Sequence, residues 1–199
     1  MYAKPIQKLI VAFSKLPSVG QRTAERFVFF LLKSGKKDVG ELMMSLGNLM
    51  EQIKSCSLCW DFSDQSPCSL CTDPKRESTI VCVVAEPQDL QTLERVGAYR
   101  GRYHVLRGRI RTDEENTIEK LKVAELLMRI ENEKITEVIL ALSPDLAGET
   151  TMLYLEEKLK KIKPTLIVSR LARGLPMGSD LQYADQITLE SALKHRTKS

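Results

Sequence analysis

The chain has 199 residues, and its 30 lysines and arginines outnumber its 26 aspartates and glutamates, which gives a formal net charge of +4. With 43% apolar and 28% charged residues, its composition is ordinary for a soluble protein. The length allows one or two compact domains and excludes a large multidomain enzyme. No run approaches the ~20 apolar residues of a membrane span, and the opening residues do not resemble a secretory signal. We therefore expect a cytoplasmic protein with no membrane partner.

The basic excess lies at the beginning of the chain. Residues 1–54 carry nine basic and four acidic side chains, a net charge of +5, which leaves −1 for the remainder. A basic module attached to a nearly neutral body indicates a polyanionic partner such as nucleic acid, although solvated lysines on helix faces produce the same count.

The first 54 residues are predicted to form several short helices, because their apolar positions recur at intervals of three and four. The turn Leu16–Gly20 separates two helical patterns: its proline ends the first helix and its glycine allows the second to begin. This pattern is typical of a helix-hairpin-helix, whose backbone N–H groups face a phosphate without reading a base. Arg22 and Arg26 share one face beside the turn and would extend the phosphate contact. The alternative is an ordinary corner between two helices, with both arginines facing water.

Residues 55–76 contain two Cys-x-x-Cys pairs, Cys56 with Cys59 and Cys68 with Cys71, but too few apolar residues for a core. Four thiolates at this spacing predict a structural Zn²⁺ site, in which metal binding supplies the folding free energy and no position stays open for a catalytic water. Two disulfides are disfavoured in a reducing cytoplasm. A redox role is weaker still, because neither pair opens a helix after a strand.

From Ile80 onward, strand and helix patterns alternate. Three β-branched runs predict buried strands, a shorter run predicts a fourth strand, and helical patterns lie between or after them. The expected strands are 80–85, 103–106, 138–142 and 165–169, and the expected helices are 89–96, 114–131, 150–162 and 189–194. This order predicts a mostly parallel sheet covered by helices. Cys82 is expected to be a small buried residue of the first strand.

The motifs stand in a specific order: LPSVGQRTAERF, the two cysteine pairs, and a β-α unit that begins TIVCVVAEPQDLQTLER and runs through GAYRGRYHVL. With the tail RLARGLPMGSDLQYADQITLESAL, the chain resembles, over essentially its whole length, the RecR family of bacterial recombination mediators. The resemblance implies an α/β multidomain fold with four parts. These are a helix-hairpin-helix DNA-binding region at 1–54, a zinc-finger module at 55–76, a Toprim domain at 77–170 and a C-terminal segment at 171–199.

The C-terminal segment includes a Walker-B-like stretch, GLPMGSDLQYAD, with Asp180 as its first acid. No Gly-rich phosphate loop accompanies this stretch, so we infer no nucleotide hydrolysis.

The resemblance also implies a function. Members of the family form ring-like oligomers, typically tetramers, that clamp DNA and act with RecO and RecF to load RecA onto single-stranded gaps, and they are not known as catalysts. For this chain it implies a non-enzymatic homo-oligomer that binds single- and double-stranded DNA independently of sequence. It places DNA-contacting residues at Arg22 and Arg26 and the zinc ligands at the four paired cysteines.

Two carboxylates usual in the family are missing. A Toprim metal site needs clustered carboxylates, because Mg²⁺ takes oxygen ligands. Here Ala85 replaces a glutamate after the first strand, Glu86 is expected on the opposite face, and Ala147 replaces the first acid of an acid-Gly-acid motif. Asp145 and Glu149 remain for at most a weak Mg²⁺ site. The rival function, a Toprim-type Mg²⁺-dependent nuclease or primase-like enzyme, is thus disfavoured, and a RecO contact through this patch is in doubt.

Residues 95–111 contain arginines, tyrosines and a histidine but no acid. Besides Arg95 and Arg111 at its two ends, the stretch contains Arg100, Arg102, Arg107 and Arg109. The family pattern YRG-x-YHVL-x-G predicts only the first of these. We expect the stretch to line the DNA path, because basic side chains near aromatic rings suit single strands; a strand edge protected by arginine would look similar. The remaining alternative function is a zinc-stabilised scaffold that binds only proteins.

Overall fold

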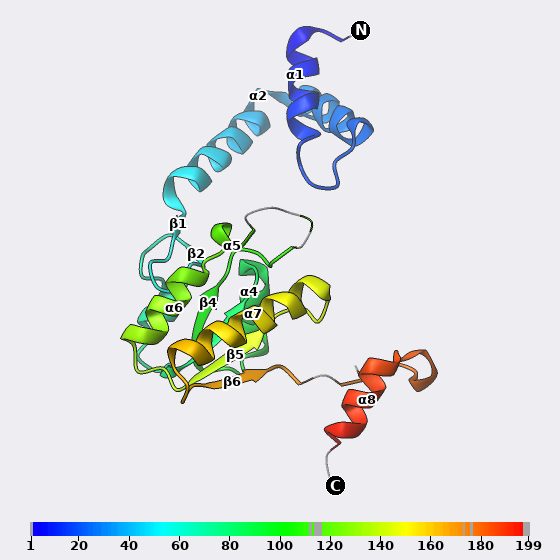
Figure 1. Ribbon diagram of the computed structural model, residues 1–199. Helices are drawn as coiled ribbons and strands as arrows, with labels where there is room; N and C mark the ends of the chain where they lie inside the picture. Colours follow the sequence, from blue (N-terminus) through cyan, green and yellow to red (C-terminus); the bar gives the residue numbers. More distant parts are fainter. Residues whose placement is uncertain (1, 112, 114–116, 173, 176, 197–199) are drawn as a thin grey trace. The chain divides into compact units, whose positions relative to one another are not determined.

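The computed structural model describes residues 2–111, 113, 117–172, 174–175 and 177–196. The chain divides into two compact units, Met1–Ile53 and Lys54–Ser199. The first is helical, and the second contains the paired cysteines, a parallel sheet and the C-terminal helix (Figure 1). Among the described residues, no helix combines the length and apolar character needed to cross a membrane.

The helical unit consists of α1 (Lys4–Phe13) and α2 (Gln21–Gln52), joined by the predicted tight turn. Ile10 of α1 packs against Ala24 and Val28 of α2, and all three side chains are buried. Gly35 interrupts α2 with a φ of 89°, a conformation that glycine adopts at little cost. The unit therefore consists of a small core, formed by α1 and the first half of α2, and of the second half of α2, which follows Gly35.

A cysteine module, residues 54–76, opens the second unit. It contains the short antiparallel strands β1 (Lys54–Ser55) and β2 (Phe62–Ser63), followed by α3 (Ser69–Thr72). The sequence does not predict these elements, because strands of two residues carry no periodic signal.

The sheet domain, residues 77–172, has four parallel strands in the order β4-β3-β5-β6. The strands are β3 (Glu77–Val84), β4 (Gly101–Val105), β5 (Glu137–Ala141) and β6 (Ile167–Arg170). The helices are α4 (Pro87–Val96), α5 (Thr117–Lys120), α6 (Val123–Asn132) and α7 (Leu146–Ile162). The predicted α/β class and parallel sheet are confirmed. After the sheet come a 3₁₀ turn, Leu181–Tyr183, and α8 (Gln186–Lys194).

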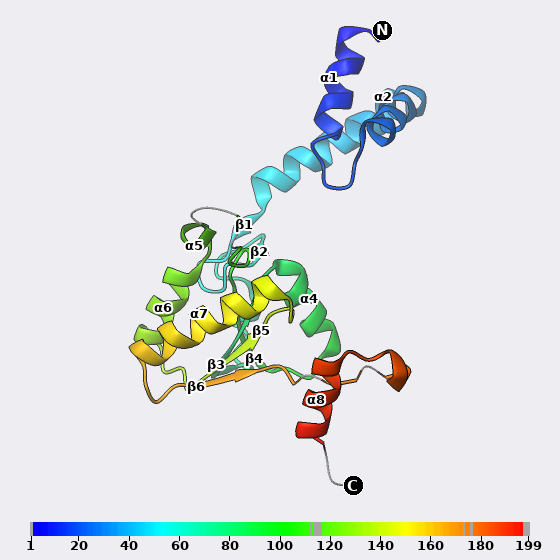
Figure 2. The ribbon, with the colours of Figure 1, turned by 45° about the vertical axis from the view of Figure 1, so that its right-hand side comes forward.

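Alternate side chains of β3 enter two different cores. Val81 and Val83 pack with α6 and α7 on one face, whereas Cys82 and Val84 pack with α4 on the other. The helices accordingly cover both faces of the sheet (Figures 1 and 2). Cys82 is buried in this second core, as predicted for a small strand residue.

The single helix predicted at 114–131 is wrong. Residues 114–116 lie outside the described part of the chain, and the rest forms two helices, α5 and α6, separated at Leu121 and Lys122. The backbone of Lys122 bonds to β4 and the residue after it: its N–H donates to the Leu106 carbonyl at 2.8 Å, and its carbonyl accepts from His104 Nε2 at 2.7 Å. These tertiary hydrogen bonds override a strongly helical local pattern.

His104 is completely buried, and its Nδ1 has no hydrogen-bond partner among the described residues. Burial lowers the pKa of the imidazole to about 4, from 6.5, because the charged form would lose hydration without gaining a partner for Nδ1. The folded state therefore requires a neutral His104.

We predict that His104 makes the fold acid-sensitive. Because its folded pKa lies below its unfolded pKa, its contribution is present above pH 6.5 and is lost as the pH falls from 6.5 towards 4. The free energy of unfolding in urea should fall by ~2 kcal/mol more in the wild type than in His104→Gln between pH 7 and pH 5. Glutamine keeps a donor for the Lys122 carbonyl but does not titrate. Equal pH dependence of the two proteins would refute the assignment.

Candidate functional site

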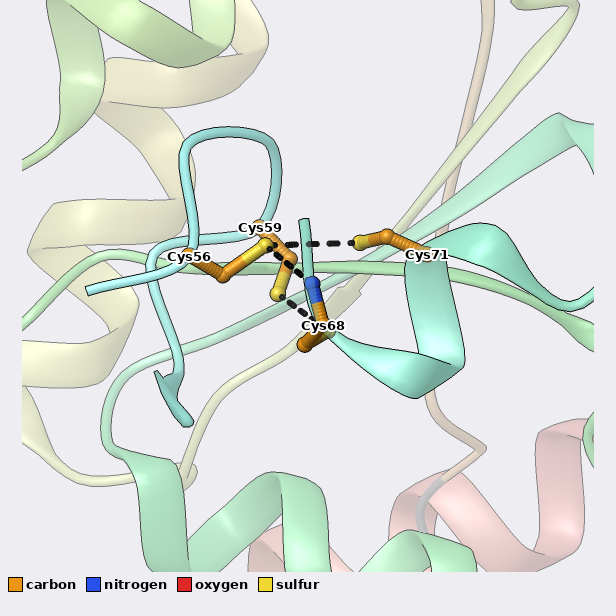
Figure 3. A group of neighbouring side chains, drawn as sticks. All are labelled: Cys56, Cys59, Cys68 and Cys71. Atoms are coloured by element: carbon orange, nitrogen blue, oxygen red, sulfur yellow. Dashed lines mark hydrogen bonds between the residues drawn. The ribbon is translucent and has the colours of Figure 1, made fainter. Parts of the chain in front are cut away.

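The four paired cysteines converge within the cysteine module. Their sulfur atoms all lie within 4.8 Å of one another, and all four side chains are buried. Figure 3 shows the cluster from two chain segments: Cys59 Sγ lies 3.5 Å from Cys68 Sγ, and Cys56 Sγ lies 3.9 Å from Cys71 Sγ. In the described part of the chain, this is the one group of three or more histidine, cysteine or acidic side chains close enough to share a metal ion.

The geometry of the cluster fits a tetrahedral ion. Metal–sulfur bonds of ~2.3 Å place the sulfurs of a tetrahedral site about 3.8 Å apart, close to the two measured separations. The amides of Leu58 and Cys68 donate to Cys56 Sγ at 3.5 and 3.3 Å, which stabilises negative charge on that sulfur. Hydrogen bonding to Cys59 and Cys71 lowers the pKa of Cys68, while the bond to Cys68 raises the pKa of Cys59, so negative charge in the cluster is favoured on Cys68. The cluster can therefore hold a metal ion, and its donor set is consistent with zinc.

Arg22 and Arg26 lie in the first two turns of α2, and both are exposed. They face away from the small core, to which the same helix contributes Ala24 and Val28. Neither arginine has an ion-pair partner in the part of the chain that the structure describes. Gly20 provides no side-chain cap, so no side-chain cap occupies the first-turn amides of α2 beside the two cations. The structure thus places two guanidinium groups near a positive helix end.

The four arginines predicted near the DNA path differ in their surroundings. Arg100 is exposed and has no ion-pair partner within the described residues. Arg102 lies 3.9 Å from Glu133, and Arg109 pairs with Asp145. Arg107 donates from Nε to the Trp60 carbonyl at 2.7 Å and stacks on an aromatic ring of the cysteine module. Three of the four are therefore bound to partners within their own chain.

The acidic residues at the carboxyl edge of the sheet are also engaged. Asp145 caps α7 by accepting from Gly148 N–H; this bond and the Arg109 guanidinium hold the pKa of its carboxyl below the ordinary value. Glu149 accepts from Arg170 at 3.1 Å. Glu86 caps α4, and its carboxylate accepts a hydrogen bond from the backbone of the first turn of that helix. The described residues gather no carboxylate cluster at this edge, which agrees with the two missing acids.

Three known family models match parts of the chain. Residues 6–50 match the RecR helix-hairpin-helix model, residues 79–172 match the Toprim domain, and residues 174–197 match the RecR C-terminal model. Fold and site thus define a protein that joins a helix-hairpin-helix, a four-cysteine module and a Toprim domain.

Full-length relatives identify the family. The chain is 43% identical over 194 residues to Recombination protein RecR of an Anaeromyxobacter species, covering 98% of this chain and 97% of the relative. It is 43% identical over 195 residues to that of Moorella thermoacetica and 42% identical over 196 residues to that of Gloeobacter violaceus, with similar coverage. The chain belongs to the RecR family of recombination proteins. The names of these relatives describe recombination proteins.

Sequence reasoning missed two cations that contact the cysteine module. Arg129, only 6% exposed, donates to the Leu58 carbonyl at 3.4 Å, and Lys122 Nζ lies 4.1 Å from the centre of the Trp60 ring. Both occur in the segment 114–131, which was predicted as one continuous helix. The one available signal is that Arg129 borders the apolar face formed by Leu126 and Ile130.

Replacing one cluster cysteine should abolish tight metal binding. Because four protein sulfurs complete a tetrahedral site, Cys68→Ser is expected to lower the Zn²⁺ content from about one ion per chain to near zero and to reduce thermal stability. Cys82→Ala is the matched control, since Cys82 belongs to the sheet core. Elemental analysis of the purified proteins measures the difference; a full zinc content in Cys68→Ser would contradict the assignment.

Proposed function

We propose that this protein is a DNA-binding recombination mediator that acts as an oligomeric clamp in the bacterial cytoplasm, with RecO and RecF, to promote RecA loading. The observation that carries the proposal is the pair of exposed arginines, Arg22 and Arg26, beside the uncapped amino end of α2 in a module that matches the family's helix-hairpin-helix. Membership of the family of proteins named Recombination protein RecR supports the same reading.

The chemistry of this surface favours phosphate over bases. Backbone amides at a helix end and two guanidinium groups bind anionic oxygens, which every nucleotide presents. Contacts of this type position a protein on DNA and carry no sequence information. Binding to single- and double-stranded DNA is therefore expected to be independent of sequence and strongly dependent on salt.

The cysteine cluster is proposed to hold a structural Zn²⁺ ion. All four ligand positions come from the protein, so a bound ion has no open position for water or substrate. The ion would neutralise converging thiolates and stabilise the module. Its site provides no hydrolytic chemistry.

The rival enzymatic function finds no support in the geometry. Mg²⁺-dependent phosphoryl transfer needs carboxylates free to bind the ion. Asp145 and Glu149 are instead paired with Arg109 and Arg170. The sheet edge is therefore proposed to be non-catalytic.

We predict that Arg22→Ala combined with Arg26→Ala weakens DNA binding at low salt for every sequence. Loss of two phosphate contacts should reduce the slope of log K against log salt by ~1.8 for duplex DNA and ~1.4 for single strands. Fluorescence anisotropy with labelled oligonucleotides measures both slopes. Lys160→Ala removes an exposed cation in the last turn of α7, outside both basic stretches, and should leave them unchanged. Unchanged slopes in the double variant would contradict the role of the hairpin.

The same titration tests the second basic stretch. Arg100 is proposed to contribute a phosphate contact because its side chain is exposed. Arg102, Arg107 and Arg109 are each bound to a partner within the chain, so they contact DNA only if DNA displaces those partners. In that case, their combined replacement by alanine should flatten the slope of log K against log salt. A slope equal to that of the wild type would remove these three residues from the DNA path.

A homo-oligomeric ring is proposed from two exposed apolar surfaces. In the second half of α2, Val39, Leu42, Leu46 and Leu49 alternate at intervals of three and four, as in a helix-pairing seam. Leu46 and Leu49 are each more than half exposed. The C-terminal segment exposes a second set: Leu171, Met177, Leu181, Tyr183 and Ile187. A closed tetramer of identical chains needs either one head-to-tail contact between two different surfaces or two self-complementary contacts, and two surfaces are enough for either.

Charges placed on the α2 seam should disrupt the assembly. Leu46→Glu with Leu49→Glu is expected to reduce the mass in solution, because burial of two carboxylates in an apolar interface is unfavourable. Asn48→Glu, on the other side of the same helix, adds charge without touching the seam and should keep the wild-type mass. Sedimentation analysis compares the three proteins. A wild-type mass for the leucine variant would exclude this face as an interface.

A further inference from the structure

Three successive carbonyl groups of the first cysteine pair are bound by the sheet domain. The Leu58 carbonyl accepts from Arg129 Nη1 at 3.4 Å, and the Cys59 carbonyl accepts from the Val105 amide at 2.7 Å. The Trp60 carbonyl accepts from Arg107 Nε at 2.7 Å. The donors come from α6, from β4 and from the residues after β4. The backbone around the ligand Cys59 is thus fixed from outside the module.

Side chains on the same surface reinforce these hydrogen bonds. The Arg107 guanidinium carbon lies 3.5 Å from the centre of the Phe62 ring, and Lys122 Nζ lies 4.1 Å from the centre of the Trp60 ring. Trp60 has a φ of 64°, an unfavourable conformation for a residue other than glycine, which persists where surrounding contacts hold it. The contacts to Arg107 and Lys122 supply that constraint.

The second cysteine pair is anchored by packing. Leu70 lies between Cys68 and Cys71 in the sequence and packs against both the sulfur cluster and the sheet core on the α4 side. That core includes Tyr103 and Val105 of β4. Tyr103 also accepts, through its carbonyl, from Arg129 Nη1 at 2.8 Å. Both halves of the metal cluster therefore depend on β4 and its neighbours.

From these contacts we propose that Arg107 and Arg129 are positioning residues that lock the cysteine module onto β4, so that metal affinity of the cluster and order of the β4 edge depend on each other. This rests on the proposed Zn²⁺ site and goes beyond it. The module was expected to owe its folding to metal alone, because only the thiolates converge in its sequence. The structure adds a second source of order, supplied by the sheet domain.

The coupling between metal binding by the cluster and the order of β4 must act in both directions. If contacts to the sheet domain raise the affinity for Zn²⁺, bound Zn²⁺ stabilises those contacts by the same free energy. Loss of the ion should therefore loosen β4 and the following residues, which carry Arg107 and Arg109. The strands on the other side of β3 make none of the described bonds to the module and should stay ordered.

The first test measures release of Zn²⁺ from the full-length protein to an excess of a chromogenic chelator. Arg107→Gln removes the guanidinium at a half-buried site. Arg129→Lys keeps the charge but loses the planar guanidinium, whose Nη1 donates to two carbonyls while its Nε donates to Glu133. Both variants are expected to release Zn²⁺ at least ~10-fold faster than wild type. Loss of a residue that holds a metal ligand in place usually lowers the metal affinity by at least this factor. Arg95→Gln is the matched control and should release it at the wild-type rate.

The second test measures amide hydrogen exchange before and after Zn²⁺ removal. We expect protection to fall at Val105 and along β4, and to persist in β5. Equal release rates in the variants and the control, or unchanged protection at Val105, would each overturn the proposal. A wild-type chain that takes up no Zn²⁺ would contradict the metal site as well, whereas Zn²⁺ released at one rate from all proteins contradicts only the mutual dependence.

Discussion

The convergence of four buried sulfur atoms constrains the whole second unit. These four thiols lie within 4.8 Å of one another and can hold a cation, and because their segment has few apolar side chains the site depends on external support. The bond from Val105 N–H to the Cys59 carbonyl gives that support and satisfies a polar group at the edge of β4. An open sheet edge invites unwanted pairing, and the cysteine module lies against this one. One set of contacts thus stabilises the module and protects the sheet.

The sheet domain keeps a Toprim fold, but its described residues form no acidic cluster of the kind that metal-dependent chemistry requires. Arg109 and Arg170 occupy the carboxylates of Asp145 and Glu149, which compensates the negative charge from within the chain. An internal cation of this kind cannot polarise a substrate phosphate while it is held by its own partner. The proposed activity therefore moves to the helical unit, where the cations Arg22 and Arg26 are exposed. Fold and chemistry are separable properties in this family.

The sequence predicted the elements whose signal is local. Runs such as 80–85 identified buried strands to within a few residues, and the spacing of the cysteines predicted their convergence. The break at Lys122 was missed because it depends on hydrogen bonds to His104 and Leu106, which local helix propensity does not contain. The partners of Arg107 were missed for a similar reason, since Trp60 and Phe62 belong to a separate module. Contacts between modules depend on docking, and no periodicity encodes them.

We propose that this protein holds DNA through phosphate contacts and does not read bases. The most direct measurement is the affinity of the zinc-loaded wild type for two unrelated oligonucleotides of equal length, over a series of salt concentrations. Binding through phosphates alone predicts matching affinities and a steep linear fall of log K with log salt for both oligonucleotides. Absence of binding at the lowest salt concentration, or an affinity that is insensitive to salt, would contradict it.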